Sequence, residues 1–361
     1  MKMDRSIKIK TITQPPKGRT IAISDIHANL DGYQALLEKV RYQKGIDRLM
    51  IVGDFIEKGT KNLDTLHYLM KQSEQEDVHC IMGNCDFICK NVLYSYRLDF
   101  LHNILLMRKE SLIHEMADTL GLVLDKDTDM EQYCQTIRKH YLKELSFCND
   151  CPHIIETEDT IYVHAALQSP DHYGDDFKEV INEPFFLKQD KHYEKRVVVG
   201  HMPVTEYCHQ IATFDPIYDS KMNVYSIDGG NVVKKRSGQL NALIFEGKKV
   251  SVDHVDNLPV IKVANSVEPN NPLPLFVTWN ERKTEILHRD HEYSLVYSKA
   301  LKRKFYVENE FFENHSVSEY TNYQMPLTKG ETVKLVYEYG NKVQIKKNGV
   351  LGWAYRSDLD Y

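Results

Sequence analysis

The chain has 361 residues, more than an ordinary single domain, which favours one large domain and one small one. Its content of 42% hydrophobic and 27% charged residues is ordinary for a folded globular protein, and no apolar run reaches the roughly 20 residues that cross a bilayer. The formal net charge of -6 argues against general binding to nucleic acid or to an anionic membrane.

The first part of the chain alternates short apolar strands with amphipathic helices. Strands are predicted at 20–24, 49–52 and 78–82, and helices at 28–41 and 62–71. Polar residues follow each strand directly. This repetition predicts an α/β fold, in which the carboxyl ends of the strands gather side chains at one edge of the sheet.

Between about 87 and 150 the pattern changes to long helical segments, of which 101–120 and 130–145 are the clearest. We interpret this region as a helical insert that caps the site. Strands resume after it, at 154–155, 161–163, 197–199, 224–227 and 242–245.

The last third of the chain is expected to hold a linker and a small β domain. The stretch 257–274 is rich in Asn and Pro, and we expect a linker and irregular segment over 257–304. The expected boundaries are therefore 1–256 for the large domain and 305–361 for the small one. Strands are predicted in the small domain at 332–336, 342–345 and 352–355, with a hairpin turn at Lys347-Asn348-Gly349.

The seven cysteines are odd in number and irregularly spaced, as is typical of reduced thiols in a cytoplasmic protein. The N-terminal residues carry charge but no apolar core, so no secretory signal is expected. Cys148 and Cys151 form a lone C-x-x-C, for which we favour ordinary helix-end residues over a structural zinc or redox site.

Six residues with metal-binding side chains follow apolar strands along the chain: Asp25, His27, Asp54, Asn84, His164 and His201. Each alone also fits a helix cap, a turn residue or a hydrogen-bonded histidine. Asp25 and His27 lie two apart, so an extended backbone can aim both at one ion, whereas Asp54 has two oxygens that can bridge two ions. A pair of divalent ions about 3.5–4 Å apart can activate a shared water for attack on phosphorus. The combination therefore predicts a dinuclear phosphate-ester hydrolase.

These motifs resemble those of the calcineurin-like metallophosphoesterases. Their order is most similar to the phosphoprotein-phosphatase branch, which includes bacterial Ser/Thr phosphatases and symmetrical diadenosine tetraphosphatases. The resemblance covers about residues 20–252. The matching segments are 24–29 for G-D-x-H-G, 53–59 for G-D-x-x-D-R-G, 83–86 for G-N-H-E, 163–167 for V-H-A-G-L and 200–203 for G-H-T-P.

The resemblance implies a four-layer β-sandwich flanked by helices, which binds two divalent ions, manganese, iron or zinc. It assigns Asp25, His27 and Asp54 to one ion, and to the other Asp54, Asn84, His164 and His201. A hydroxide that bridges the ions is expected to attack a phosphomonoester, a phosphodiester or a nucleotide anhydride, on a small molecule or a phosphoprotein. Asp54 and Asp86 are the expected catalytic residues, and Asp228 matches a family aspartate near the metals.

Several positions depart from the family pattern. Cys85 stands where the family has the histidine that protonates the leaving group, and a thiol with a pKa of roughly 8.5 is a poor substitute. Glu57 and Lys58 replace the family's Asp-Arg pair, and Met82 replaces an arginine that grips phosphate. Substrates with stable leaving groups, such as phosphoanhydrides or aryl esters, are therefore favoured. The alternative is a weakened enzyme that serves as a binding or scaffold protein.

Residues 306–359 resemble bacterial Src-homology-3-like domains, most clearly in 326–331 and 343–353. The resemblance implies a small C-terminal β-barrel that attaches a peptide or protein partner. Trp353 is expected in the core of this barrel rather than on a ligand platform.

Overall fold

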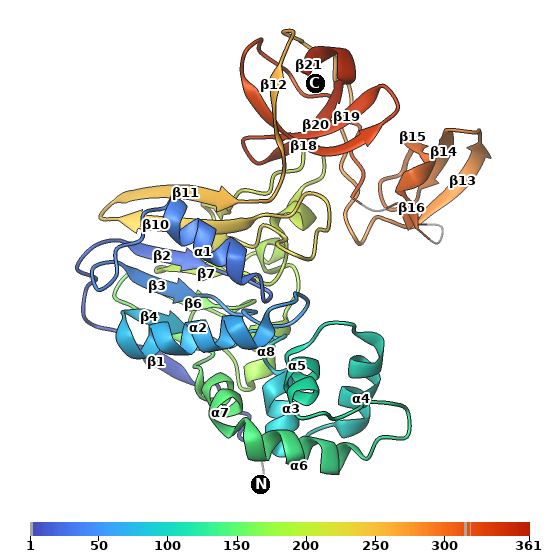
Figure 1. Ribbon diagram of the computed structural model, residues 1–361. Helices are drawn as coiled ribbons and strands as arrows, with labels where there is room; N and C mark the ends of the chain where they lie inside the picture. The colour runs from blue at the N-terminus through green and yellow to red at the C-terminus, as the bar shows by residue number, and fades with distance from the viewer. Residues whose placement is uncertain (1–2, 314–315, 318) are drawn as a thin grey trace. The chain divides into compact units, whose positions relative to one another are not determined.

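The computed structural model describes residues 3–313, 316–317 and 319–361, which divide into two compact units (Figure 1). The first unit comprises Met1–Pro203 and Pro216–Asp256, and the second comprises Val204–Asp215 and Asn257–Tyr361. No helix in these described ranges is long and apolar enough to cross a membrane.

The first unit is a mixed α/β sandwich of two sheets. The five-stranded sheet has the order β11-β10-β2-β3-β4. Its strands are β2 (Thr20–Ile23), β3 (Arg48–Ile51), β4 (Val78–Cys80), β10 (Leu240–Glu246) and β11 (Lys249–Val255). The six-stranded sheet has the order β1-β5-β6-β7-β9-β8. Its strands are β1 (Ile9–Thr11), β5 (Ile154–Glu156), β6 (Thr160–Val163), β7 (Arg196–Val199), β8 (Ile217–Asp219) and β9 (Val224–Ser226).

Strand β2 is buried on both faces, which explains its continuous apolar sequence. Successive side chains of a strand point to opposite faces. Ile21 and Ile23 pack in the cluster beneath the helices. Ala22 packs instead in the cluster between the two sheets, together with Val198 of the other sheet. The parallel strands β2, β3 and β4 of one sheet therefore pack, through this cluster, against the parallel strands β6, β7 and β9 of the other sheet.

Helices α1 (Leu30–Lys39) and α2 (Asn62–Gln75) cover the outer face of the five-stranded sheet (Figure 1). Helix α1 begins two residues later than predicted, because His27 and Ala28 adopt left-handed backbone conformations with φ of 50° and 54°. The Asn29 side chain then caps the helix by accepting a hydrogen bond from the Gly32 amide. The delayed start leaves His27 free to face the site.

The helical insert is present, but its helices are shorter than predicted. It contains α3 (Ile88–Tyr94), α4 (Leu98–Met107), α5 (Leu112–Thr119), α6 (Met130–His140) and α7 (Leu142–Asp150). The helix expected over 101–120 breaks because Arg108 is extended and Ser111 caps a new helix. The helix expected over 130–145 breaks at Tyr141. A short helix α8 (Phe177–Asn182) follows β6, with a capping box formed by Asp176 and Glu179.

The second unit consists of three small sheets, ordered β20-β19-β18-β12-β21, β13-β14-β15 and β16-β17. Asn348 and Gly349 have φ of 49° and 71°, as the predicted hairpin turn between β19 and β20 requires. The strands are β12 (Val260–Val263), β13 (Thr284–Arg289), β14 (Tyr293–Ser298), β15 (Arg303–Glu308), β16 (Phe312–Glu313), β17 (Ser316–Val317), β18 (Thr332–Tyr339), β19 (Lys342–Lys347), β20 (Val350–Tyr355) and β21 (Leu359–Asp360). The described residues of the two units also include the 3-10 turns η1 (Phe186–Lys188), η2 (Val204–Tyr207), η3 (Asn309–Phe311) and η4 (Arg356–Asp358).

The segment 257–304 is not irregular, contrary to the expectation. It contributes β12 to the same sheet as β18, and β14 to a second sheet. The strands escaped prediction because most side chains of β12 and β13 are exposed or half-buried, so no clear apolar alternation marks them. Trp353 is buried, and its indole N–H donates to the Thr321 carbonyl at 2.7 Å, as expected of a core residue.

Candidate metal centre

The loops that follow five strands carry the six predicted metal ligands. Asp25 and His27 follow β2, Asp54 follows β3 and Asn84 follows β4 in the five-stranded sheet. In the other sheet, His164 follows β6 and His201 follows β7. Because these strands are parallel within each sheet and the sheets pack face to face, the loops converge on one place.

The carboxylate of Asp54 lies between two groups of ligands. Its Oδ2 lies 4.0 Å from His27 Nε2, and its Oδ1 lies 3.4 Å from His164 Nε2. On the first side, Asp25 Oδ1 lies 3.7 Å from His27 Nε2. One carboxylate therefore presents a separate oxygen to each half of the site, as a bridging ligand would.

The second half of the site is built from an amide and two imidazoles. Asn84 Oδ1 lies 2.7 Å from His201 Nδ1 and 3.1 Å from His164 Nε2. The other ring nitrogen of His164, Nδ1, lies 2.9 Å from the Val52 carbonyl. A carbonyl can only accept, so Nδ1 carries the proton and Nε2 presents its lone pair to the site.

The backbone of the site is strained at several ligands. Asp25, His27, Asp54 and His201 have φ of 54°, 50°, 51° and 68°, in the left-handed region that few side chains tolerate. Such strain is concentrated at functional sites and persists only where the surrounding structure enforces it. At Gly83, an added Cβ would lie 2.2 Å from Asp54 Oδ1, so only glycine permits this close approach.

The electrostatics of the site suit divalent cations. Burial raises the pKa of Asp25 to about 8, and the charge of Asp54 adds to the rise. Burial lowers the pKa of both His27 and His201 to about 3, so the imidazoles are neutral, the form that binds metals. The ammonium of Lys58 reaches to 3.3 Å from His27 Nε2, so a positive charge is already accommodated beside the carboxylates. The donors and their charges therefore fit a pair of divalent ions.

Among the residues that the structure describes, two overlapping groups of three buried side chains have donor atoms within 4.8 Å of one another. One is Asp25, Asp54 and His164, and the other is His27, Asp54 and Cys85. Asp54 belongs to both. Cys148 and Cys151 are buried and belong to neither group.

Asp86 lies behind the predicted ligands and is fully buried. Its carboxylate accepts hydrogen bonds from the backbone amides of Gly83 and Asp54 at 2.8 Å, Phe55 at 3.1 Å and Ile56 at 3.3 Å. It thus ties the loop after β3 to the loop after β4.

Two supports of the site have partners that the sequence did not indicate. Glu57 is buried and forms an ion pair with Arg108 of the helical insert at 2.5 Å. Glu57 also accepts from the hydroxyl of Ser111 and the amide of Leu112, both at 2.8 Å. Asn231 donates to the carbonyl of Asp25 at 3.2 Å and to that of Ile26 at 2.8 Å, which holds the first loop. These partners are far apart in the chain, so no local pattern pairs them.

Comparison with known proteins finds one matching family and several curated relatives. Residues 18–229 match the family model described as calcineurin-like phosphoesterase. Curated relatives include two proteins named symmetrical bis(5′-nucleosyl)-tetraphosphatase. That of Pseudomonas syringae pv. tomato is 32% identical over 121 residues, which are 34% of this chain and 34% of that protein. That of Pseudomonas fluorescens is 29% identical over 148 residues, 41% of this chain and 42% of that protein. The matched part of the chain thus spans between about a third and two fifths of the length of these relatives.

Solved structures with a similar arrangement include a protein serine/threonine phosphatase from Saccharomyces cerevisiae. It is 10% identical, and the alignment covers 71% of this chain and 85% of that chain with a TM-score of 0.44. A metallophosphoesterase from Sphaerobacter thermophilus is 18% identical, with coverage of 66% and 88% and a TM-score of 0.37.

Proposed function

Since the chain belongs to the calcineurin-like phosphoesterase family, we propose that it hydrolyses phosphate esters or anhydrides at a two-metal centre. The observation that carries this proposal is the carboxylate of Asp54, which turns Oδ1 towards His164 and Oδ2 towards His27. We assign Asp25, His27 and Asp54 to one ion. The other ion takes Asp54, Asn84, His164 and His201.

Two divalent ions, when bound, polarise a phosphoryl group and lower the pKa of the water that attacks it. The chain's own part is to hold the donors in place. The Val52 carbonyl fixes the tautomer of His164, and the backbone bonds to Asp86 fix the loop of Asp54. We therefore give Asp86 a positioning role, in place of the catalytic role that the sequence predicted. Asp54 acts as a ligand.

Cys85 occupies the position at which a general acid would protonate the leaving group, and its thiol is a poor proton donor. Burial raises the pKa of this thiol well above its usual range, so it is a weak acid and carries no charge. Substrates whose leaving group is stable without a proton, namely aryl esters and phosphoanhydrides, are therefore preferred. The tetraphosphates named for the curated relatives contain such anhydride bonds.

A substrate panel tests the proposal. Purified protein loaded with manganese, iron or zinc is assayed with an aryl phosphate, a diaryl phosphate, ADP, diadenosine tetraphosphate and a phosphoserine peptide. We expect metal-stimulated turnover of the aryl esters or anhydrides and slower turnover of the peptide. Asp64→Asn, on the exposed face of α2, serves as the matched control for Asp54→Asn. Metal-bound protein that turns over none of these substrates would favour the scaffold alternative.

A further inference from the structure

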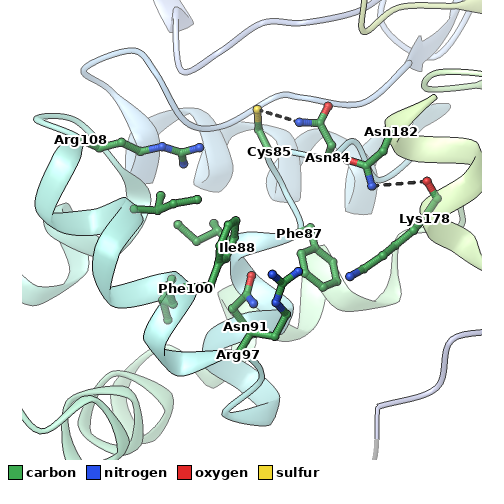
Figure 2. A pocket seen from close by; sticks show the side chains of 12 residues that line it. Asn84, Cys85, Phe87, Ile88, Asn91, Arg97, Phe100, Arg108, Lys178 and Asn182 are labelled. Atoms are coloured by element: carbon green, nitrogen blue, oxygen red, sulfur yellow. Dashed lines mark hydrogen bonds between the residues drawn. The ribbon is translucent and has the colours of Figure 1, made fainter. Parts of the chain in front are cut away.

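A pocket of about 220 Å³ opens beside the proposed metal centre (Figure 2). Asn84 and Cys85 line one end of it. Asn84 is itself a proposed ligand, and its Oδ1 lies 2.7 Å from His201 Nδ1. The remaining walls come from α3, α4 and α8, with Arg108 at the break in the insert. A molecule with a phosphoryl group at the metals would extend into this pocket.

The charge of the pocket is entirely positive. Its lining includes Arg97, Arg108 and Lys178 and no carboxylate. In the whole chain, by contrast, 52 acidic residues outnumber 46 basic ones. Arg108 is paired with Glu57, but neither Arg97 nor Lys178 forms an ion pair with any residue that the structure describes. Two cations without a carboxylate partner at a pocket wall favour an anionic ligand.

Aromatic rings hold these two cations over the pocket. The guanidinium of Arg97 lies 4.5 Å from the centre of the Phe100 ring. The ammonium of Lys178 lies 5.2 Å from the centre of the Phe87 ring and 5.3 Å from that of Tyr96. Such contacts orient a cation and leave its hydrogen-bond donors available for a ligand. Figure 2 shows Arg97 and Lys178 on either side of Phe87.

The backbone places Arg97 in a strained but supported position. Ser95 and Arg97 have φ of 48° and 53°, both left-handed, in the short connection between α3 and α4. Arg138 donates to the Ser95 hydroxyl at 2.7 Å, and the side chain of Asn91 donates to the Tyr96 carbonyl at 2.7 Å. The connection is thus fixed from two sides, which presents Arg97 to the pocket without further ordering.

The rest of the pocket is small and mainly apolar, with the amide side chains of Asn91 and Asn182 also in its lining. Phe87, Ile88, Phe100, Leu101 and Ile104 supply apolar surface next to the cations. Pockets that enclose a whole drug-sized ligand measure about 300–1,000 Å³, so the present volume accommodates one ring and one charged group. A flat protein or peptide surface does not fill such a hollow.

We propose that this pocket binds the part of the substrate beyond the reacting phosphoryl group. It selects organic phosphates that carry a flat ring and a second anionic group. Arg97 and Lys178 bind the second anion, and the rings of Phe87 and Phe100 pack against the organic part. The proposal rests on the proposed function, because it takes the reacting phosphoryl group to be at the metal centre.

Two matched esters test the selection. Phenyl phosphate carries a ring alone, whereas 4-carboxyphenyl phosphate adds one carboxylate to the same ester. We expect the manganese-loaded protein to show a kcat/KM about tenfold higher for the carboxylated ester, mainly through a lower KM, as a charge-assisted contact should give. The double variant Arg97→Gln, Lys178→Gln should lose this preference, so that its kcat/KM values for the two esters become equal. Arg97→Lys should retain the preference.

A charge change elsewhere serves as the control. Lys139→Gln, on the exposed surface of α6, should leave the preference unchanged. A preference that is absent in the natural chain, or that survives in the double variant, overturns the proposal.

Binding without turnover separates this proposal from the proposed function. In calorimetric titration, 4-carboxyphenylphosphonate should bind the natural chain about tenfold more tightly than phenylphosphonate does. The double variant should bind the two phosphonates equally weakly. If neither ester is hydrolysed, the proposed function fails, and the titration alone decides the role of the pocket. If the esters are hydrolysed but the phosphonates bind equally to the natural chain, the pocket proposal fails.

Discussion

Glu57 and Arg108 form a 2.5 Å ion pair that joins the loop carrying Asp54 to the helical insert. Glu57 is fully buried, whereas the Arg108 side chain is 32% exposed and also lines the pocket. The insert is therefore not a loosely attached cap. Its buried side chains also belong to the same apolar cluster as those of α2, so the insert and the loops that carry the candidate ligands share one core.

Arg108→Ala should lower the stability of the fold. It leaves the Glu57 carboxylate buried without its cation, a change that costs about 3–5 kcal/mol when both partners are buried. Because Arg108 is partly exposed, we expect a loss of about 2 kcal/mol in the free energy of unfolding. Urea unfolding measures it, with Lys109→Ala at the exposed neighbouring position as control. Equal stability of the two variants would show that the ion pair does not anchor the insert.

Asp86→Asn should weaken metal binding more than it slows the chemistry. Asparagine keeps one acceptor oxygen but places a donor opposite backbone amides that now donate to Asp86. Changes in such supporting residues lower metal affinity by about 10–100-fold. Competition with a coloured chelator measures the affinity, with Asp99→Asn on the exposed side of α4 as control. Unchanged metal affinity combined with lost turnover would instead support the catalytic role that the sequence predicted.

Cys85→Ala should change the turnover of an aryl phosphate by less than about threefold. By comparison, removal of a functional general acid slows a reaction by about 10²–10⁴-fold. The reason is that the buried thiol is too weak an acid to protonate a leaving group. Steady-state kinetics at saturating manganese checks this expectation. A hundredfold loss without loss of metal would identify Cys85 as a catalytic residue.

His153 should make the metal-free protein sensitive to acid. Burial, reinforced by the charge of Lys90, lowers the pKa of His153 from 6.5 to about 3. The unfolded chain therefore binds a proton between these values that the folded chain does not, so stability falls as the pH decreases below 6.5. One such histidine contributes about 1.4 kcal/mol per pH unit.

The variant His153→Asn isolates this contribution, since its amide oxygen can accept the Lys8 amide hydrogen bond that Nδ1 now accepts at 2.9 Å. Urea unfolding at pH 7, 6 and 5 in the presence of a chelator should give a shallower pH dependence than in the natural chain. His67→Asn, at an exposed position, should leave the slope unchanged. Identical slopes for all three proteins would exclude His153 as a source of acid sensitivity.

The sequence predicted that the candidate ligands come together, because each follows a buried strand and the packing of the strands decides where their ends lie; that they bind metal stays a prediction. Asp25, Asp54 and Asn84 are examples in one sheet. The sequence could not predict which side chains support these candidate ligands. Glu57 and Arg108 are 51 residues apart, and Arg108 lay within a helix predicted to be continuous. The positioning role proposed for Asp86 also had no basis in the sequence, because its four backbone partners become apparent only when two loops fold together.

The second unit shows which strands could be predicted from the sequence and which could not. Strands β18, β19 and β20 have apolar alternation and a strong turn, and they were predicted. Strand β13 has neither, because its side chains are mostly exposed and its place is set by pairing with β14. The resemblance to a Src-homology-3-like domain and a peptide or protein partner stay predictions.

The number of divalent ions bound per chain tests the two-metal centre most directly. After reconstitution with manganese and removal of free metal, elemental analysis should find two ions per natural chain and two per Asp64→Asn chain. Asp54→Asn, which removes one of the two carboxylate oxygens that face His27 and His164, should retain at most one. A natural chain that holds no ion, or an Asp54→Asn chain that keeps both, would contradict the account.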